Sequence, residues 1–163
     1  MPVDYFDSDY FNGLISSAKS NTRRRKNRNI HSSYNEPCQR LFNAIEPDSY
    51  IRPHRHSQDK KGELLIAIKG LMALLTFNDN GVIENVFHFG SEKFGINMAS
   101  GVEVPSSSWH TVVALEPGSV LLEVKTGPFD ISQSKELAVW APEEASPEAD
   151  LFLQSLLQEV MQS

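Results

Sequence analysis

The sequence has 163 residues, of which 40% are hydrophobic and 22% charged, a composition typical of one globular domain. Its formal net charge of −6 argues against a general nucleic-acid-binding protein. Cys38 is the only cysteine, which excludes an intrachain disulfide and favours a reducing, cytoplasmic location. We expect neither a signal peptide nor a membrane span, because no basic segment leads into an apolar run and no apolar stretch is long enough.

The basic residues are concentrated in one short segment. Arg23, Arg24, Arg25, Lys26 and Arg28 lie close together, whereas the C-terminal segment is acidic. A basic run of this kind is usually a solvated connector. The alternative is a rim that binds a phosphate or carboxylate group of a ligand, and the sequence leaves both interpretations open.

In chain order, the first predicted element is a short helix over residues 7–19, where apolar side chains recur on one side. The pattern then changes to short strands separated by turn residues, among which Asn78-Asp79-Asn80-Gly81 is a strong hairpin signal. The predicted strands cover residues 41–45, 50–56, 63–68, 71–77, 82–89, 94–98, 101–104, 109–115 and 120–125. Short strands at this spacing indicate a sandwich or barrel.

A second helix is predicted near the C-terminus. Ser146-Pro147-Glu148 offers a capping hydroxyl, a proline at the first helical position and an acid in the first turn. An apolar stripe follows, made of Leu153, Leu156, Leu157, Val160 and Met161. We expect this stripe to pack on the same domain or on a dimer partner.

Four residues suggest a metal site. His54 and His56 are two apart on a predicted strand, so their imidazoles point to the same face. Glu63 adds a carboxylate from the next strand, and His110 can add a third imidazole from a distant one. This mixed nitrogen and oxygen set suits one divalent ion of Fe, Zn, Mn or Ni, and leaves coordination positions open.

These residues resemble the cupin superfamily, whose first motif is G-x5-H-x-H-x(3–4)-E-x6-G. His54, His56, Glu63 and Gly70 fit it, although the loop from His56 to Glu63 is about two residues longer than usual. The second motif, G-x5-P-x-G-x2-H-x3-N, is kept at Pro105 and His110 and lost at its other positions. The resemblance implies a mainly β fold: a single cupin-type antiparallel β-barrel (jelly roll) with a short helix at each end. We divide the chain into an N-terminal helix and basic connector (1–30), the barrel (31–140) and a C-terminal helix (141–163).

Most of the chain, from Arg28-Asn29-Ile30-His31 through PHRHSQDKKGE to WAPEE, resembles the WbuC family of cupin-fold metalloproteins. Members often lie among genes for bacterial surface polysaccharides, which implies sugar-related chemistry. The resemblance also implies a homodimer, and it places Arg28 and His31 near the site. If the N-terminal segment covers the barrel mouth, His31 could act as a general acid or base.

Strand alternation and position add three candidate ligand contacts. Tyr50 and Arg52 should share the inward face of His54, where Arg52 could pair with an anionic group or form a structural ion pair. Lys125 ends an apolar strand and could face the same cavity as a cation or simply terminate the strand. The expected partner is a small-molecule ligand, with an anionic group as one option.

Three functions are compatible with this set. The first is a metal-dependent enzyme that acts on a small polar metabolite such as a sugar or sugar phosphate, by isomerisation or epimerisation. The second is an Fe(II)-dependent oxygenase with the same ligands. The third is a non-catalytic metabolite-binding module, because fold does not determine function. We favour the first of these, and the sequence leaves the substrate and the metal undetermined.

Overall fold

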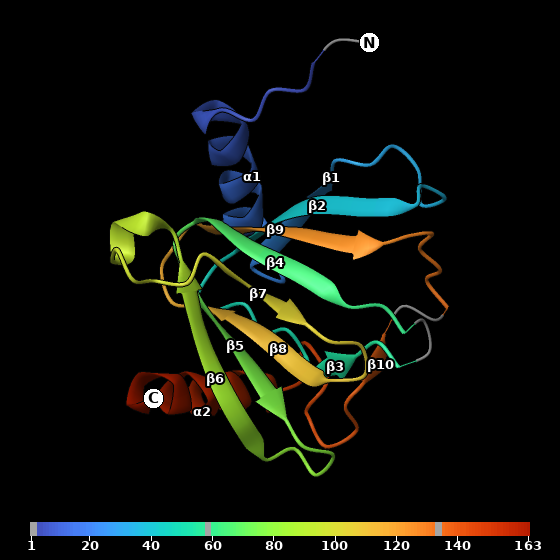
Figure 1. The fold of residues 1–163 in the computed structure, drawn as a ribbon. Helices are drawn as coiled ribbons and strands as arrows, with labels where there is room; N and C mark the ends of the chain where they lie inside the picture. The colour runs from blue at the N-terminus through green and yellow to red at the C-terminus, as the bar shows by residue number, and fades with distance from the viewer. Residues whose placement is uncertain (1–2, 58–59, 133–134) are drawn as a thin grey trace.

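The computed structural model describes residues 3–57, 60–132 and 135–163, and its strands form two five-stranded antiparallel sheets (Figure 1). Sheet A has the order β1 (Arg25–Asn29), β2 (Cys38–Ile45), β9 (Ser119–Thr126), β4 (Glu63–Lys69) and β7 (Gly101–Val104). Sheet B has the order β10 (Glu136–Leu137), β3 (His54–Arg55), β8 (Trp109–Ala114), β5 (Leu71–Phe77) and β6 (Ile83–Gly90). The predicted mainly β fold with a helix at each end is confirmed.

The alternation of side chains along the strands builds two separate apolar layers on sheet B. Met72 and Leu74 of β5 face sheet A, whereas Leu75 and Phe77 face the C-terminal helix. The layer between the sheets consists of Ile45, Leu65, Met72, Leu74, Phe89, Val104, Val112, Ala114 and Leu121. The same alternation brings inward-facing polar residues of β4, β8 and β9 to one end of this layer.

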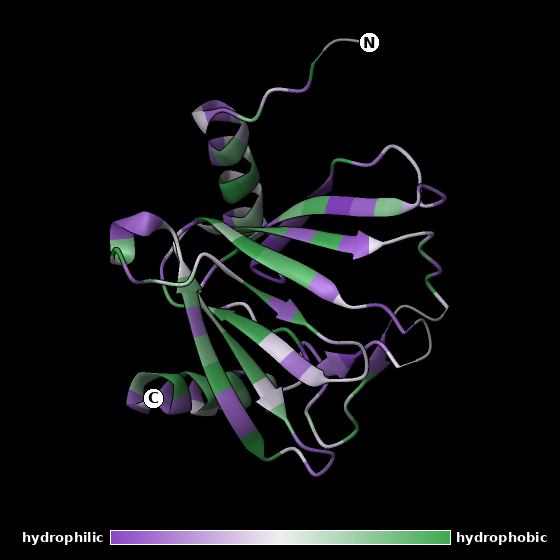
Figure 2. Cartoon of the chain, in the orientation of Figure 1, coloured by the Kyte–Doolittle hydropathy of each residue, from purple (hydrophilic) through white to green (hydrophobic). Residues whose placement is uncertain are grey.

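The two helices cover the outer faces of the two sheets (Figure 1). Helix α1 (Ser8–Ser20) is capped by Asp7, whose carboxylate accepts a hydrogen bond of 2.9 Å from the Tyr10 amide, and it buries Leu14 and Ala18 against sheet A. Helix α2 (Ala149–Gln162) buries Leu153, Leu156 and Val160 against sheet B. Figure 2 shows the resulting mixture of hydrophobic and hydrophilic residues along both helices. Most of the predicted apolar stripe of α2 is therefore packed within the same chain, whereas Met161 is exposed. No helix among the described residues is long and apolar enough to cross a membrane.

Three predicted elements differ from the structure. Residues 25–29, expected in a connector, form β1, which pairs with β2 from Arg25↔Ile45 to Asn29↔Leu41; its sequence RKNRN has no apolar alternation to reveal it. The predicted strand 50–56 is reduced to β3, since Pro53 has no amide N–H to donate to a ladder. The predicted strand 94–98 is wrong, because the chain there leaves a 3₁₀ turn (Glu92–Phe94) at Gly95, whose φ is 141°.

Candidate metal centre and its cavity

The structure brings His54, His56, Glu63 and His110 together. His54 of β3 pairs in register with His110 of β8, and Glu63 begins β4 on the facing sheet. All four side chains are buried, and one ligand atom from each lies within 4.8 Å of the others. The centre of the long loop between His56 and Glu63, residues 58–59, lies outside the described part of the chain.

Two of the imidazoles are held in the tautomer that a metal requires. His54 Nδ1 lies 3.0 Å from the Arg52 carbonyl oxygen, and His110 Nδ1 lies 2.8 Å from the Ser108 carbonyl oxygen. A carbonyl oxygen only accepts, so both Nδ1 atoms donate and both Nε2 atoms keep a lone pair. Backbone carbonyls of this kind are common partners of metal-ligating histidines. His54 and His110 therefore fit a metal site.

His56 has a different partner. Its Nδ1 lies 2.7 Å from Lys125 Nζ, and its Nε2 lies 2.8 Å from Glu63 Oε1. An ammonium group only donates, so in this arrangement Nδ1 accepts and Nε2 carries the proton that faces Glu63. Binding a metal through Nε2 requires the other tautomer, in which the contact with Lys125 must change. Lys125 therefore contacts the cluster directly and lines the cavity, which is the first of its two predicted alternatives.

The surroundings of Glu63 and His54 keep both side chains in the protonation state that binds a metal ion. Burial alone would raise the pKa of Glu63, but its close contacts with the His110 and His56 imidazoles hold that pKa well below its usual range, so the carboxylate is ionised. Burial lowers the pKa of His54 well below its usual value, so this imidazole is neutral near pH 7. Neutral imidazoles and an ionised carboxylate are the protonation states that bind a divalent cation.

A cavity of about 500 Å³ opens from the cluster along the inner face of sheet A. His56, Glu63 and Lys125 form part of its wall, and so does His31. A void of about 50 Å³ continues from it to His54 and His110. The volume is in the usual range of small-molecule sites.

His31 is buried with 6% of its surface exposed, and it is anchored by the main chain of β2. Its Nδ1 lies 3.0 Å from the Arg40 amide nitrogen and 2.8 Å from the Arg40 carbonyl oxygen. Arg40 therefore offers this nitrogen both a donor and an acceptor, so that either neutral tautomer can be held. The other nitrogen, Nε2, is buried and has no hydrogen-bond partner among the described residues. The predicted position of His31 at the site is thus supported by the cavity that it lines.

Tyr50 and Arg52 are not placed as strand alternation predicted. Tyr50 packs against Phe152 of α2 and donates a hydrogen bond of 2.9 Å to the Pro142 carbonyl, and burial raises its pKa to about 12. Arg52 donates to the Ala138 carbonyl at 2.7 and 3.0 Å and lines a separate surface pocket beside His54. The prediction failed because residues 50–53 are not a strand, so alternation does not apply to them.

Arg28 also lies away from the cavity. It is on the face of β1 that is covered by α1, and its guanidinium lies 4.7 Å from the centre of the Tyr10 ring. Its neighbour Arg25 is buried and binds Glu144 at 2.6 and 2.7 Å, while Arg24 pairs with Asp48. Arg24 and Arg25 thus make structural contacts, but Arg23, Arg25 and Lys26 also line the cavity, so both interpretations of the basic cluster stay open.

Sequence reasoning missed Glu123, Gln39 and Asn43, which also line the cavity. Burial, with the nearby charge of Glu63, raises the pKa of Glu123 to about 7. Glu123 is two residues before Lys125 on a predicted strand, so alternation could have found it. Gln39 lies before the predicted start of its strand and carried no such signal.

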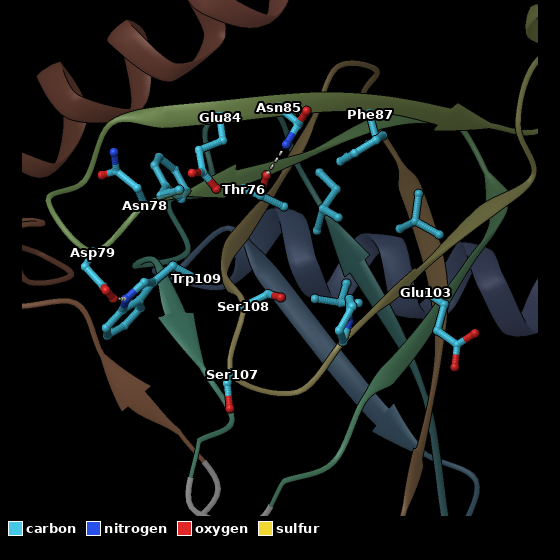
Figure 3. Close-up of a pocket in the computed structure, with 15 residues that line it drawn as sticks. Thr76, Asn78, Asp79, Glu84, Asn85, Phe87, Glu103, Ser107, Ser108 and Trp109 are labelled. Carbon is cyan, nitrogen blue, oxygen red and sulfur yellow. Dashed lines mark hydrogen bonds between the residues drawn. The ribbon is translucent and has the colours of Figure 1, made fainter.

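A larger cavity of about 710 Å³ lies between β5, β6 and β7 (Figure 3). Four of its polar residues are engaged with each other: Asn85 donates to Thr76 at 3.3 Å, and the Trp109 indole donates to Asp79 at 2.9 Å. None of the four cluster residues lines it. The smaller cavity is therefore the one with the potential for metal chemistry.

Solved structures share the fold of the chain at low sequence identity. Protein SO0799 from Shewanella oneidensis is 12% identical with a TM-score of 0.58, over 93% of this chain and 94% of that one. CapF with the inhibitor 3-isopropenyl-tropolone is 15% identical with a TM-score of 0.59, over 72% of this chain. Oxalate decarboxylase from Bacillus subtilis at pH 4.6 is 19% identical with a TM-score of 0.51, over 69% of this chain. The match spans only 32% of CapF and 27% of the decarboxylase, and these likenesses support a cupin fold.

Among curated proteins, no sequence matches the chain. A family model described as "Domain of unknown function (DUF6016)" matches residues 6–89. This range includes α1, β1 and three of the four cluster residues, namely His54, His56 and Glu63. The chain belongs to the DUF6016 family.

Proposed function

We propose that the protein is a metal-dependent enzyme that isomerises or epimerises a small polar metabolite such as a sugar or sugar phosphate. The observation that carries this proposal is the buried set of His54, His56, Glu63 and His110, which borders a ligand-sized cavity. Three imidazoles and one carboxylate suit Fe, Zn, Mn or Ni and leave positions open for a ligand. When bound, such an ion supplies Lewis-acid polarisation of a carbonyl or hydroxyl group.

The chain supplies a group that can move a proton. His31 lines the cavity, its Nε2 has no hydrogen-bond partner among the described residues, and Arg40 can hold Nδ1 in either tautomer. His31 can therefore take a proton from the carbon beside a substrate carbonyl and return it to a neighbouring carbon or to the opposite face. Lys125 and Lys135 border the same cavity and can orient an anionic group of the substrate.

The sequence resemblance to the WbuC family favours a sugar as the substrate, in line with a role in surface polysaccharide biosynthesis. We also propose a cytoplasmic location, since Cys38 is a free thiol, and a homodimeric state. The dimer is testable by sedimentation equilibrium, where a mass near 18.3 kDa would contradict it.

Proton abstraction beside a carbonyl gives a direct assay. Metal-loaded protein is incubated in D₂O with a panel of aldose and ketose phosphates and nucleotide sugars, and deuterium at carbon is followed by NMR. We expect exchange into at least one substrate, and a loss of about 100-fold in the His31→Gln variant. The matched control is His88→Ala, since His88 lies on β6 outside the cluster.

The outcome of the exchange assay distinguishes an isomerase from an oxygenase and from a binding module. Exchange that persists in His31→Gln would contradict the role of His31. Iron loading with substrate-dependent oxygen uptake and no exchange would instead indicate an oxygenase. Ligand binding without any turnover would indicate a binding module.

A further inference from the structure

The cavity wall contains buried polar atoms that lack partners. Gln39 Oε1, Asn43 Oδ1 and His31 Nε2 are inaccessible to solvent and accept or donate no hydrogen bond within the described residues. All three residues line the cavity beside the His–Glu cluster. Buried polar groups are almost always hydrogen-bonded, so atoms of this kind mark a place where another molecule completes the bonding.

The orientation of the Gln39 amide is determined by its other half. Gln39 Nε2 lies 2.9 Å from the Glu36 carbonyl, 3.2 Å from the Tyr34 carbonyl and 3.3 Å from the Ser33 carbonyl. Three carbonyl oxygens around this atom require it to be the NH₂ group. The unpartnered atom is therefore the oxygen, and Gln39 offers the cavity an acceptor.

The two amides extend along one strand toward the cluster. On β2, Gln39 lies opposite Lys125 and Asn43 lies opposite Leu121 of β9. Four residues of strand separate them, which corresponds to about 13 Å. Asn43 also lines the small void that reaches His54 and His110. Gln39 thus lies at the cavity, and Asn43 lies at both the cavity and the void that reaches His54 and His110.

The chemistry of these atoms restricts the ligand. An acceptor needs a donor, and phosphate or carboxylate oxygens that are ionised cannot donate. An ammonium group could donate, but the basic residues that line the same cavity (Arg23, Arg25, Lys26, Lys125 and Lys135) outnumber its two carboxyl groups, Glu63 and Glu123. Neutral hydroxyl groups meet both requirements. Tyr34 and Phe129, whose ring centres are 5.1 Å apart, add an apolar wall that suits the C–H face of a sugar ring.

We propose that Gln39 and Asn43 bind the hydroxyl groups of a neutral sugar ring, and that any anionic group of the ligand lies toward Lys125 and Lys135. This inference rests on the proposed function only in taking this cavity as the ligand site. Gln39 and Asn43 are thus the residues that recognise the sugar, and neither belongs to the metal cluster.

The test is a direct binding measurement that does not depend on turnover. Saturation-transfer-difference NMR is recorded with neutral hexoses, 6-deoxyhexoses and N-acetylhexosamines, and with inorganic phosphate as the anionic probe. The variant is Asn43→Leu, which replaces an amide whose oxygen is buried without a partner by an apolar side chain of similar size and should fold at least as well. The matched control is Asn85→Leu on β6, at the other cavity.

We expect at least one neutral sugar to bind, with affinity at least tenfold weaker in Asn43→Leu and unchanged in Asn85→Leu, while the metal content of both stays that of the wild type. No binding of any sugar by the wild type would overturn the proposal and would mean that water alone completes these atoms. Sugar binding unaffected by Asn43→Leu would overturn it as well. Sugar binding that Asn43→Leu abolishes, in wild-type protein that takes up no metal even after reconstitution, would support this inference while contradicting the proposed metal enzyme.

Discussion

Removal of the Glu144 carboxylate tests whether the basic segment is structural. Arg25 is 9% exposed, and Glu144 binds it at 2.6 and 2.7 Å and also binds Arg23 at 3.0 Å. These contacts join β1 to the segment before α2. Glu144→Ala leaves the Arg25 guanidinium buried with the Tyr50 carbonyl and Ser49 as its remaining partners across the fold.

The magnitude follows from the burial of the pair. Breaking a fully buried ion pair costs about 3–5 kcal/mol and an exposed one at most about 1 kcal/mol. Glu144 is 31% exposed, so we expect about 2 kcal/mol, or a decrease in Tm of about 4–8 °C for a chain of this size. The matched control is Glu143→Ala: Glu143 is 83% exposed and 3.9 Å from Arg52, so its loss should cost less than about 0.5 kcal/mol.

The pH dependence supplies a second readout. Burial alone would raise the pKa of Glu144, but the hydrogen bond and charge of Arg25 hold it below its usual value of 4.5. A carboxyl with a lowered folded-state pKa stabilises the fold above its unfolded pKa and loses this contribution as pH falls through the folded value. The difference in free energy of unfolding between wild type and Glu144→Ala, from urea titrations, should be constant from pH 7 to about 5 and shrink below it. Equal stability of the Glu144→Ala and Glu143→Ala variants would refute the reasoning.

Three further substitutions test the packing around the site. Gly70→Ala should cost about 2 kcal/mol in urea unfolding, because φ is 81° and a Cβ would clash with Ser119 Oγ; an unchanged midpoint would contradict this conformation. Leu156→Ala should cost about 3 kcal/mol, since Leu156 of α2 is 2% exposed, and a loss below 1 kcal/mol would mean that α2 is not docked on sheet B. Tyr50→Phe should cost about 1 kcal/mol through loss of its bond to Pro142 and leave metal content and sugar binding unchanged; a specific loss of ligand binding would return Tyr50 to the site.

The metal cluster could be predicted because strand alternation and motif spacing act together. His54 and His56 differ by two positions, and His110 belongs to a strand whose apolar neighbours Val112 and Ala114 share its inward face. Lys125 was a candidate only because it ends a predicted apolar strand. These features are local and periodic, so a single sequence displays them.

The remainder depends on contacts between distant parts of the chain. The pairing of Arg25 with Glu144 joins residues that are 119 positions apart, and nothing in either segment reveals it. Strand β1 is polar throughout, so only its pairing with β2 identifies it as a strand. Tyr50 was misplaced because Pro53 interrupts the strand that alternation assumed. That the amide oxygens of Gln39 and Asn43 lack hydrogen-bond partners could not be predicted, because it depends on the hydrogen bonds of the folded chain.

Metal content tests the central claim most directly. Untagged protein purified without oxygen or chelator is measured by inductively coupled plasma mass spectrometry, together with the His56→Ala/Glu63→Ala double variant and the His88→Ala control. We predict about one equivalent of Fe, Zn, Mn or Ni per chain in the wild type and the control, and almost none in the folded double variant. Wild-type protein that stays metal-free after reconstitution, or full occupancy in the double variant, would contradict the assignment of this cluster as a metal centre.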